Sequence, residues 1–147
     1  MTHPNVALVQ KMYDCFNRGD METLKREVFS EELEWRLPGH HPLAGTKSGA
    51  DEVIAFFAQL VKSNIKVDLI KIDVFGEDFV VEVHRGYGQA GTARLDARNC
   101  THYHVVDGRI RDVQVYLSDQ HAADQFFNQS HQLAPIPQRL ASQAQGE

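Results

Sequence analysis

Apolar residues in the first sixty positions recur at the spacing of amphipathic helices. The first predicted helix carries Val9, Met12, Tyr13 and Phe16 on its apolar face, and the polar and glycine residues at 17–20 end it. The same spacing predicts two further helices: one that Asp20 caps, with Leu24, Val28 and Phe29, and one after a capping box at Ser48 and Asp51, with Val53, Phe56, Phe57, Leu60 and Val61. Between these two helices, apolar and charged residues alternate over 33–37, which predicts a half-buried strand.

From residue 64 onward the apolar positions follow the period of a strand. Ile65, Val67 and Leu69 share one face, whereas Ile70 and Ile72 continue on the opposite parity. A β-bulge explains this change, because one extra residue moves every later side chain to the other face. We therefore expect a long, bent strand.

Three more strands are predicted in the second half of the chain, over 79–86, 94–106 and 109–117. Asp107 and Gly108 join the last two strands and are typical of a two-residue hairpin turn. Helices followed by a long antiparallel sheet indicate an α+β protein.

The end of the chain is predicted to hold one more helix and a tail. Ser118 or Asp119 caps this helix, which carries Ala122, Ala123, Phe126 and Phe127. We expect a single domain over 1–129 and a loosely held tail over 130–147, which is rich in Gln, Ala, Pro and Ser.

Composition narrows the class of protein. A chain of 147 residues is long enough for one domain with a small pocket, and a net charge of −5 argues against a nucleic-acid partner. No apolar run reaches the roughly 20 residues of a membrane helix, and residues 1–10 lack the layout of a signal peptide. Cys15 and Cys100 fit neither a disulfide framework nor a zinc site, so we expect a cytoplasmic protein.

Several motifs, in order, resemble the SnoaL-like branch of the nuclear transport factor 2-like superfamily, which is related to ketosteroid isomerase. They lie within Val9–Asp20, Trp35–Thr46, Asp107–Ile110 and Tyr116–Phe126. The resemblance implies a cone-shaped, cystatin-like α+β barrel, in which a strongly curved mixed sheet wraps around a pocket that the N-terminal helices close. Members include isomerases, epoxide hydrolases, dehydratases, polyketide cyclases and proteins that only bind ligands, so the fold leaves the function open.

The catalytic residues of two such relatives have no equivalent in this chain. The resemblance places Met12 where ketosteroid isomerase has its oxyanion-hole tyrosine, and Leu37 where that enzyme has its general base. It places Val115 at the position of a carboxylate of limonene-epoxide hydrolase. We therefore expect neither of these two mechanisms.

Histidine is the remaining candidate for chemistry. Counting back from the Asp107–Gly108 turn pairs His104 with Arg111, His102 with Val113, and Cys100 with Val115. The resemblance implies that the Val115 position faces the pocket, so His102 and His104 are expected to face it too. His84 would join them from the preceding strand, and His41 from the loop at the pocket mouth.

These residues predict an isomerase, lyase or cyclase that acts by acid–base catalysis on a small hydrophobic carbonyl compound, without a cofactor. His84, His102 and His104 are the candidate catalytic residues, because imidazole accepts and returns protons near neutral pH, and Glu82 or Asp96 could orient one of them. The residues expected to bind substrate are Phe16, Trp35, His41, Phe57, Glu82, Val113 and Val115.

The sequence leaves two alternative functions open and predicts one protein partner. The chain could be a non-catalytic protein that binds a small hydrophobic molecule, or His102 and His104 could bind a metal ion. We also expect a homodimer through the outer face of the sheet, with Tyr103, Val105 and Tyr116 contributing.

Overall fold

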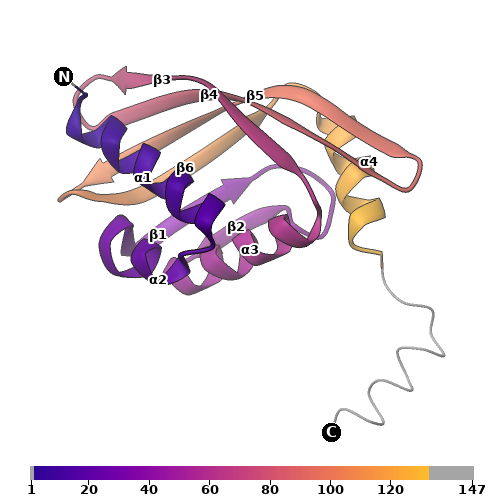
Figure 1. Ribbon diagram of the computed structural model, residues 1–147, viewed down its shortest axis with the longest axis horizontal. Helices are drawn as coiled ribbons and strands as arrows, with labels where there is room; N and C mark the ends of the chain where they lie inside the picture. Colours follow the sequence, from indigo (N-terminus) through magenta and orange to yellow (C-terminus); the bar gives the residue numbers. More distant parts are fainter. Residues whose placement is uncertain (1, 133–147) are drawn as a thin grey trace, which may run out of the picture.

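The computed structural model describes residues 2–132 and has the α+β architecture predicted from the sequence (Figure 1). The helical elements are α1 (Pro4–Arg18), α2 (Met21–Thr23), the π-helical turn η1 (Leu24–Val28), α3 (Ala50–Lys62) and α4 (Gln120–Ser130). The strands are β1 (Phe29–Leu37), β2 (Gly45–Ser48), β3 (Lys66–Phe75), β4 (Phe79–Ala90), β5 (Ala93–Val106) and β6 (Arg109–Leu117).

The six strands form one mixed sheet in the order β2-β1-β6-β5-β4-β3. Only β1 and β6 are parallel, and the other neighbours are antiparallel. Pairing shifts by one residue between Leu69 and Lys71 in β3, which confirms the predicted bulge. Bulges increase the local bend of a sheet, and this sheet curves around its inner face.

The helices close the curved sheet from two sides. Figure 1 shows α1 and α3 across the inside of the curve, and α4 beside the hairpin formed by β4 and β5. Helix α1 contacts β3, β4 and β6, whereas α3 packs on β1 and β2, and α4 packs on β4 and β5. The apolar face of each long helix is buried in this core, as its periodicity predicted.

Local signals explain most of the helix boundaries. The carboxylates of Asp20 and Asp119 accept hydrogen bonds from the amides of Thr23 and Ala122, so both are N-caps as expected. The capping box predicted at Ser48 is wrong. Gly49 is the N-cap of α3, with a φ of 87° that favours glycine.

The region between α2 and α3 differs from the prediction in two ways. Phe29 begins β1 instead of continuing a helix, so β1 starts four residues before the predicted strand at Leu33. A short strand, β2, that the hydrophobic pattern does not predict pairs with the end of β1. Its four residues have no buried side chain and therefore no alternating apolar pattern.

The β5–β6 hairpin has the predicted turn but not the predicted register. Asp107 and Gly108 both have positive φ, as in a type I′ turn, and Val106 pairs with Arg109. Beyond Val105 and Ile110, however, a bulge in β6 shifts the pairing by one residue, so that His104 lies opposite Asp112.

This bulge reverses the predicted face of β5. Val113 now pairs with Tyr103 and Val115 with Thr101, and both pairs lie on the inner face. The expectation that His102 and His104 face inward is therefore wrong, because both lie on the outer face.

The outer-face role expected for Tyr103 and Val105 is wrong for the same reason. Their exposed fractions are 1% and 5%, whereas Tyr116, which is on the outer face, is 50% exposed.

Two further expectations concern the C-terminal tail and membrane-spanning helices. The predicted tail lies, from residue 133 onward, outside the described residues. Within residues 2–132, no helix is long and apolar enough to cross a membrane.

Candidate active site

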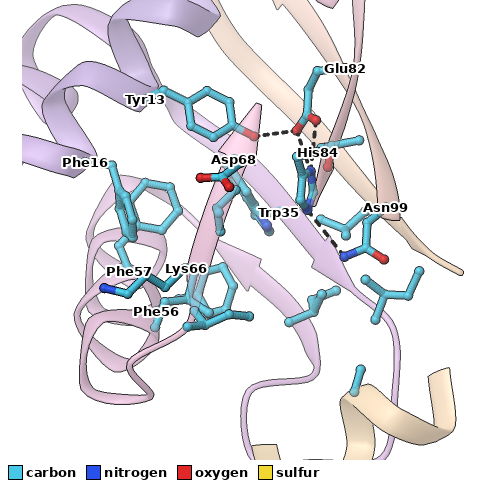
Figure 2. Close-up of a pocket in the computed structure, with 18 of the residues that line it drawn as sticks. Tyr13, Phe16, Trp35, Phe56, Phe57, Lys66, Asp68, Glu82, His84 and Asn99 are labelled. Atoms are coloured by element: carbon cyan, nitrogen blue, oxygen red, sulfur yellow. Dashed lines mark hydrogen bonds and ion pairs between the residues drawn. The ribbon is translucent and has the colours of Figure 1, made fainter. Parts of the chain in front are cut away.

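A cavity of about 320 Å³ lies between the inner face of the sheet and helices α1 and α3. Figure 2 shows Phe16, Phe56 and Phe57 on one side of it. Glu82 and His84 lie on the other side, on β4. The cavity thus has an aromatic wall from the helices and a polar wall from the sheet.

Glu82 is the centre of the polar wall. Its side chain has no exposed surface, and its Oε1 atom accepts hydrogen bonds from the Tyr13 hydroxyl at 2.6 Å and the Tyr103 hydroxyl at 3.0 Å. The Nδ1 atom of His84 lies 2.9 Å from Oε2. A carboxylate can accept from all of these donors, which offset the cost of burying its charge.

Both tyrosines act as donors in this network. Burial raises the pKa of Tyr13 and of Tyr103 well above the ordinary value of 10.0, and the nearby charge of Glu82 raises each further. The two hydroxyls therefore keep their protons at neutral pH and hold the carboxylate in place.

The network assigns the tautomer of His84. Because Nδ1 donates to Glu82, the neutral ring carries its free electron pair on Nε2. Nε2 lies 3.5 Å from the side-chain nitrogen of Asn99, another residue that lines the cavity. This atom can accept a proton from a ligand in the cavity.

The wall formed by the helices and β1 also contains one unpaired donor. The indole nitrogen of Trp35 is buried and has no hydrogen-bond partner among the described residues. Trp35 packs edge-on against Phe57 and Tyr103, with ring centroids 5.2 and 6.1 Å away.

The structure brings six of the predicted site residues together. Those that line the cavity are Phe16, Trp35, Phe57, Glu82, His84 and Val115. Val113 is fully buried in the core but does not line the cavity. Asp96, the alternative partner for a histidine, pairs instead with Arg85 at 2.8 Å.

His41 was expected at the mouth of the pocket, but it does not line the cavity. Its ring lies 4.7 Å from that of Phe127, which does line the cavity, and its Nδ1 accepts from the amide of Leu43. Burial lowers the pKa of His41. His41 thus packs against α4, behind the cavity wall.

His102 and His104 lie apart from the cavity. His102 contacts the Tyr116 hydroxyl at 3.2 Å, and His104 stacks on Phe79 with centroids 4.4 Å apart. Among the described residues, no group of three His, Cys, Asp or Glu side chains could hold a metal ion.

Three residues of the polar wall were absent from the sequence prediction. The sequence predicts Tyr13 only as part of a helix core and Tyr103 on the outer face, and it predicts no role for Asn99. Asn99 and Tyr103 could have been found by alternation, because both share the parity of Thr101 in β5. The alternation in β5 shows which side chains face the cavity only when the bulge in β6 is known.

The curved sheet, the helices inside it and the cavity between them define a class of cone-shaped α+β proteins. A family model described as the SnoaL-like domain matches residues 9–113. The chain therefore belongs to the SnoaL-like domain family, which confirms the resemblance identified in its motifs.

Relatives match this chain over most of their length. An uncharacterized protein of Mycobacterium tuberculosis is 28% identical over 126 residues, covering 84% of this chain and 95% of the relative. Bal32a, from a soil-derived mobile gene cassette, has a TM-score of 0.78 and 30% identity, with 84% of this chain and 96% of Bal32a covered.

More distant structures share the fold alone. TerC, co-crystallized with polyporic acid, has a TM-score of 0.71 and 20% identity, with 85% of this chain and 98% of TerC covered. Others are described as NTF2-like or cystatin-like, the fold that the sequence implied.

Proposed function

We propose that this protein is an enzyme that moves a proton next to the carbonyl group of a small hydrophobic compound, with His84 as the base. The observation that carries the proposal is the buried Glu82–His84 pair, in which both residues line the cavity. A neutral imidazole oriented by a carboxylate is a common arrangement for general-base catalysis.

The proposed reaction begins when His84 Nε2 removes a proton from the carbon beside the carbonyl. The electron pair of the broken C–H bond forms a C=C bond, and the carbonyl electrons move to oxygen to give an enolate. In an isomerase that acts on a β,γ-unsaturated ketone, the enolate re-forms its carbonyl, the C=C bond moves next to the carbonyl, and the γ-carbon takes the proton from the imidazolium. In a lyase, the carbonyl re-forms, and a group on the β-carbon departs with its bonding electron pair and takes the proton from the imidazolium. In a cyclase, the enolate carbon would instead attack a second carbonyl, and the imidazolium would protonate the alkoxide that forms.

Glu82 supports this step in two ways. It holds Nδ1 of His84 protonated, which leaves Nε2 as the acceptor, and its negative charge stabilises the imidazolium that forms. Tyr13 and Tyr103 hold Glu82 from the other side, so the carboxylate needs no rearrangement during the reaction.

The cavity favours a ring-shaped, apolar substrate. Its aromatic wall offers apolar faces and edges to a ring, and its volume of about 320 Å³ suits a small molecule. TerC, a protein of the same fold, was co-crystallized with polyporic acid, which is consistent with a small-molecule ligand for this chain.

A non-catalytic binding protein is the second candidate. Met12 and Leu37 line the cavity where the resemblance to ketosteroid isomerase would require a tyrosine and a carboxylate. The loss of those two groups favours a site that binds an apolar molecule without reacting with it.

Proton exchange in heavy water separates the two candidates. The probe is 2-tetralone, a small cyclic ketone, and the replacement of its α-protons by deuterium is followed by proton NMR. We expect the wild-type protein to accelerate exchange, and His84→Gln to lower the protein-catalysed rate by about 10²-fold or more.

His104→Gln is the matched control, because it removes an imidazole that also pairs with a carboxylate but lies on the outer face. Its exchange rate should equal that of the wild type. A wild-type protein that binds 2-tetralone without accelerating exchange would favour the binding candidate, and equal rates for His84→Gln and wild type would refute the role of His84.

A further inference from the structure

Asn99 lies beside the proposed base and is itself buried. It stands in β5 directly opposite His84 in β4, its exposed fraction is 9%, and it lines the cavity. Figure 2 shows its amide group directed toward the His84 ring. Burying a polar amide costs free energy unless it finds partners.

The partners of Asn99 determine which end of the amide faces the cavity. The Oδ1 atom accepts a hydrogen bond from the backbone amide of Ser118 at 3.3 Å. The nitrogen therefore points the other way, to a position 3.5 Å from Nε2 of His84. This distance is at the outer limit of a hydrogen bond, so the N–H groups of Asn99 remain able to bind a ligand.

We infer that Asn99 binds the oxygen atom of the substrate and makes the site selective for ketones with an acidic α-hydrogen. This inference rests on the proposed function. Asn99 Nδ2 and His84 Nε2 are a donor and an acceptor side by side. A ketone carries its oxygen and its α-hydrogen on adjacent carbon atoms, so one small ligand can meet both atoms of the pair.

The same contact stabilises the reaction. As His84 removes the α-proton, negative charge builds up on the carbonyl oxygen. An N–H donor directed at that oxygen stabilises such a charge more strongly than it stabilises the neutral ketone. Asn99 would therefore contribute to both substrate selection and rate.

The arrangement also defines how the substrate lies. With its oxygen on Asn99, the apolar ring extends across the cavity toward the aromatic side chains of α1 and α3, which include Phe16 and Phe57. A hydrocarbon of the same shape would fill the same space but leave the amide of Asn99 without an acceptor.

The test compares the binding of 2-tetralone with that of tetralin, which has the same rings and no oxygen. Trp35 is the single tryptophan of the chain and lines the cavity, so its fluorescence reports binding. We expect the wild type to prefer the ketone by about tenfold, and Asn99→Leu to lose this preference while it still binds tetralin.

Asn99→Ala is the second variant, because it removes the amide donor and adds no volume to the cavity. It should also lose the preference, even if Asn99→Leu folds poorly. Gln114→Leu, which removes an amide from the outer face of β6, is the control and should behave as the wild type.

The α-proton exchange assay separates this inference from the proposed function. We expect Asn99→Leu to slow exchange by about 10²-fold, and His84→Gln to slow it by about 10²-fold or more while it keeps the preference for the ketone. A wild type with no preference for the ketone, or an Asn99→Ala variant that retains the preference, overturns the role of Asn99. A preference that depends on Asn99 in a wild type without exchange supports the binding role of Asn99 and overturns the proposed reaction.

Discussion

Two histidine–carboxylate pairs lie on opposite faces of the same sheet. On the inner face, Glu82 and His84 are 2.9 Å apart, and their side chains are 0% and 12% exposed. On the outer face, Asp78 and His104 are 3.2 Å apart, and their side chains are 61% and 31% exposed. The chemical groups are alike, but their surroundings differ.

Burial, rather than residue type, therefore separates a candidate active site from an ion pair at the surface. Water can replace either partner of the outer pair, and solvent screens their attraction. The inner pair is held by two tyrosine hydroxyls, and its field acts through a poorly screened interior. A preorganised base in a cavity needs the second environment.

The largest expected effect follows from removing the inner carboxylate. Glu82→Gln replaces an oxygen that accepts hydrogen bonds with an amide group that donates them, so a buried donor loses its partner. We expect the free energy of unfolding to fall by about 3 kcal/mol. Denaturant unfolding followed by circular dichroism measures this change.

Asp78→Asn is the matched change on the outer face, and it should alter the free energy of unfolding by no more than about 0.5 kcal/mol. Equal costs for the two substitutions would contradict the contrast between the faces.

A smaller effect is expected from the tyrosines, and it depends on pH. In the folded protein the pKa of Tyr103 is raised well above 10.0, whereas the unfolded chain releases this proton near the ordinary value. Stability from this group is therefore complete below pH 10 and is lost as the pH rises toward the pKa of the folded state. Tyr103→Phe should cost about 1–2 kcal/mol at neutral pH and make the alkaline loss of stability less steep.

The control for this prediction is Tyr116→Phe on the outer face, where the hydroxyl contacts only His102 among the described residues. Unfolding curves collected from neutral pH to about pH 11 should match those of the wild type. A Tyr103→Phe variant with the same slope against pH as the wild type would refute the buried hydroxyl as the source.

The smallest expected effect on the folded chain concerns the proposed homodimer. Tyr116 is half exposed on the outer face, so Tyr116→Glu should change the free energy of unfolding by less than about 0.5 kcal/mol. It should nevertheless convert a dimer to a monomer in sedimentation velocity, because a buried carboxylate disfavours pairing of two copies. A wild type that sediments as a monomer at every concentration rules out the dimer.

Much of the fold could be predicted because its signals are local. Helical spacing located α1, α3 and α4, and the change of parity after Leu69 located the bulge in β3. The Asp107–Gly108 turn was equally plain, because both positions require a positive φ. Strand β2 could not be predicted, because its side chains are not buried and follow no apolar pattern.

The candidate site was predicted only in part, for a reason that lies in one strand. Glu82 and His84 were both identified, but a bulge near Arg111 exchanged the faces of β5 relative to β6. A bulge of this kind has no clear local signal, since Val113 and Val115 fit either register by hydrophobicity alone. The error placed His102 and His104 inside and Tyr103 outside.

Periodicity, turn residues and motif order depend on neighbours along the chain, and they are enough to predict the α+β class, the SnoaL-like family and the presence of Glu82 and His84 on one strand. The folded chain is needed to show which face of the sheet is buried, and hence that Tyr13, Tyr103 and Asn99 meet this pair. Those contacts join a helix and two strands, and the curvature that brings them together comes from bulges and packing, which no single segment specifies.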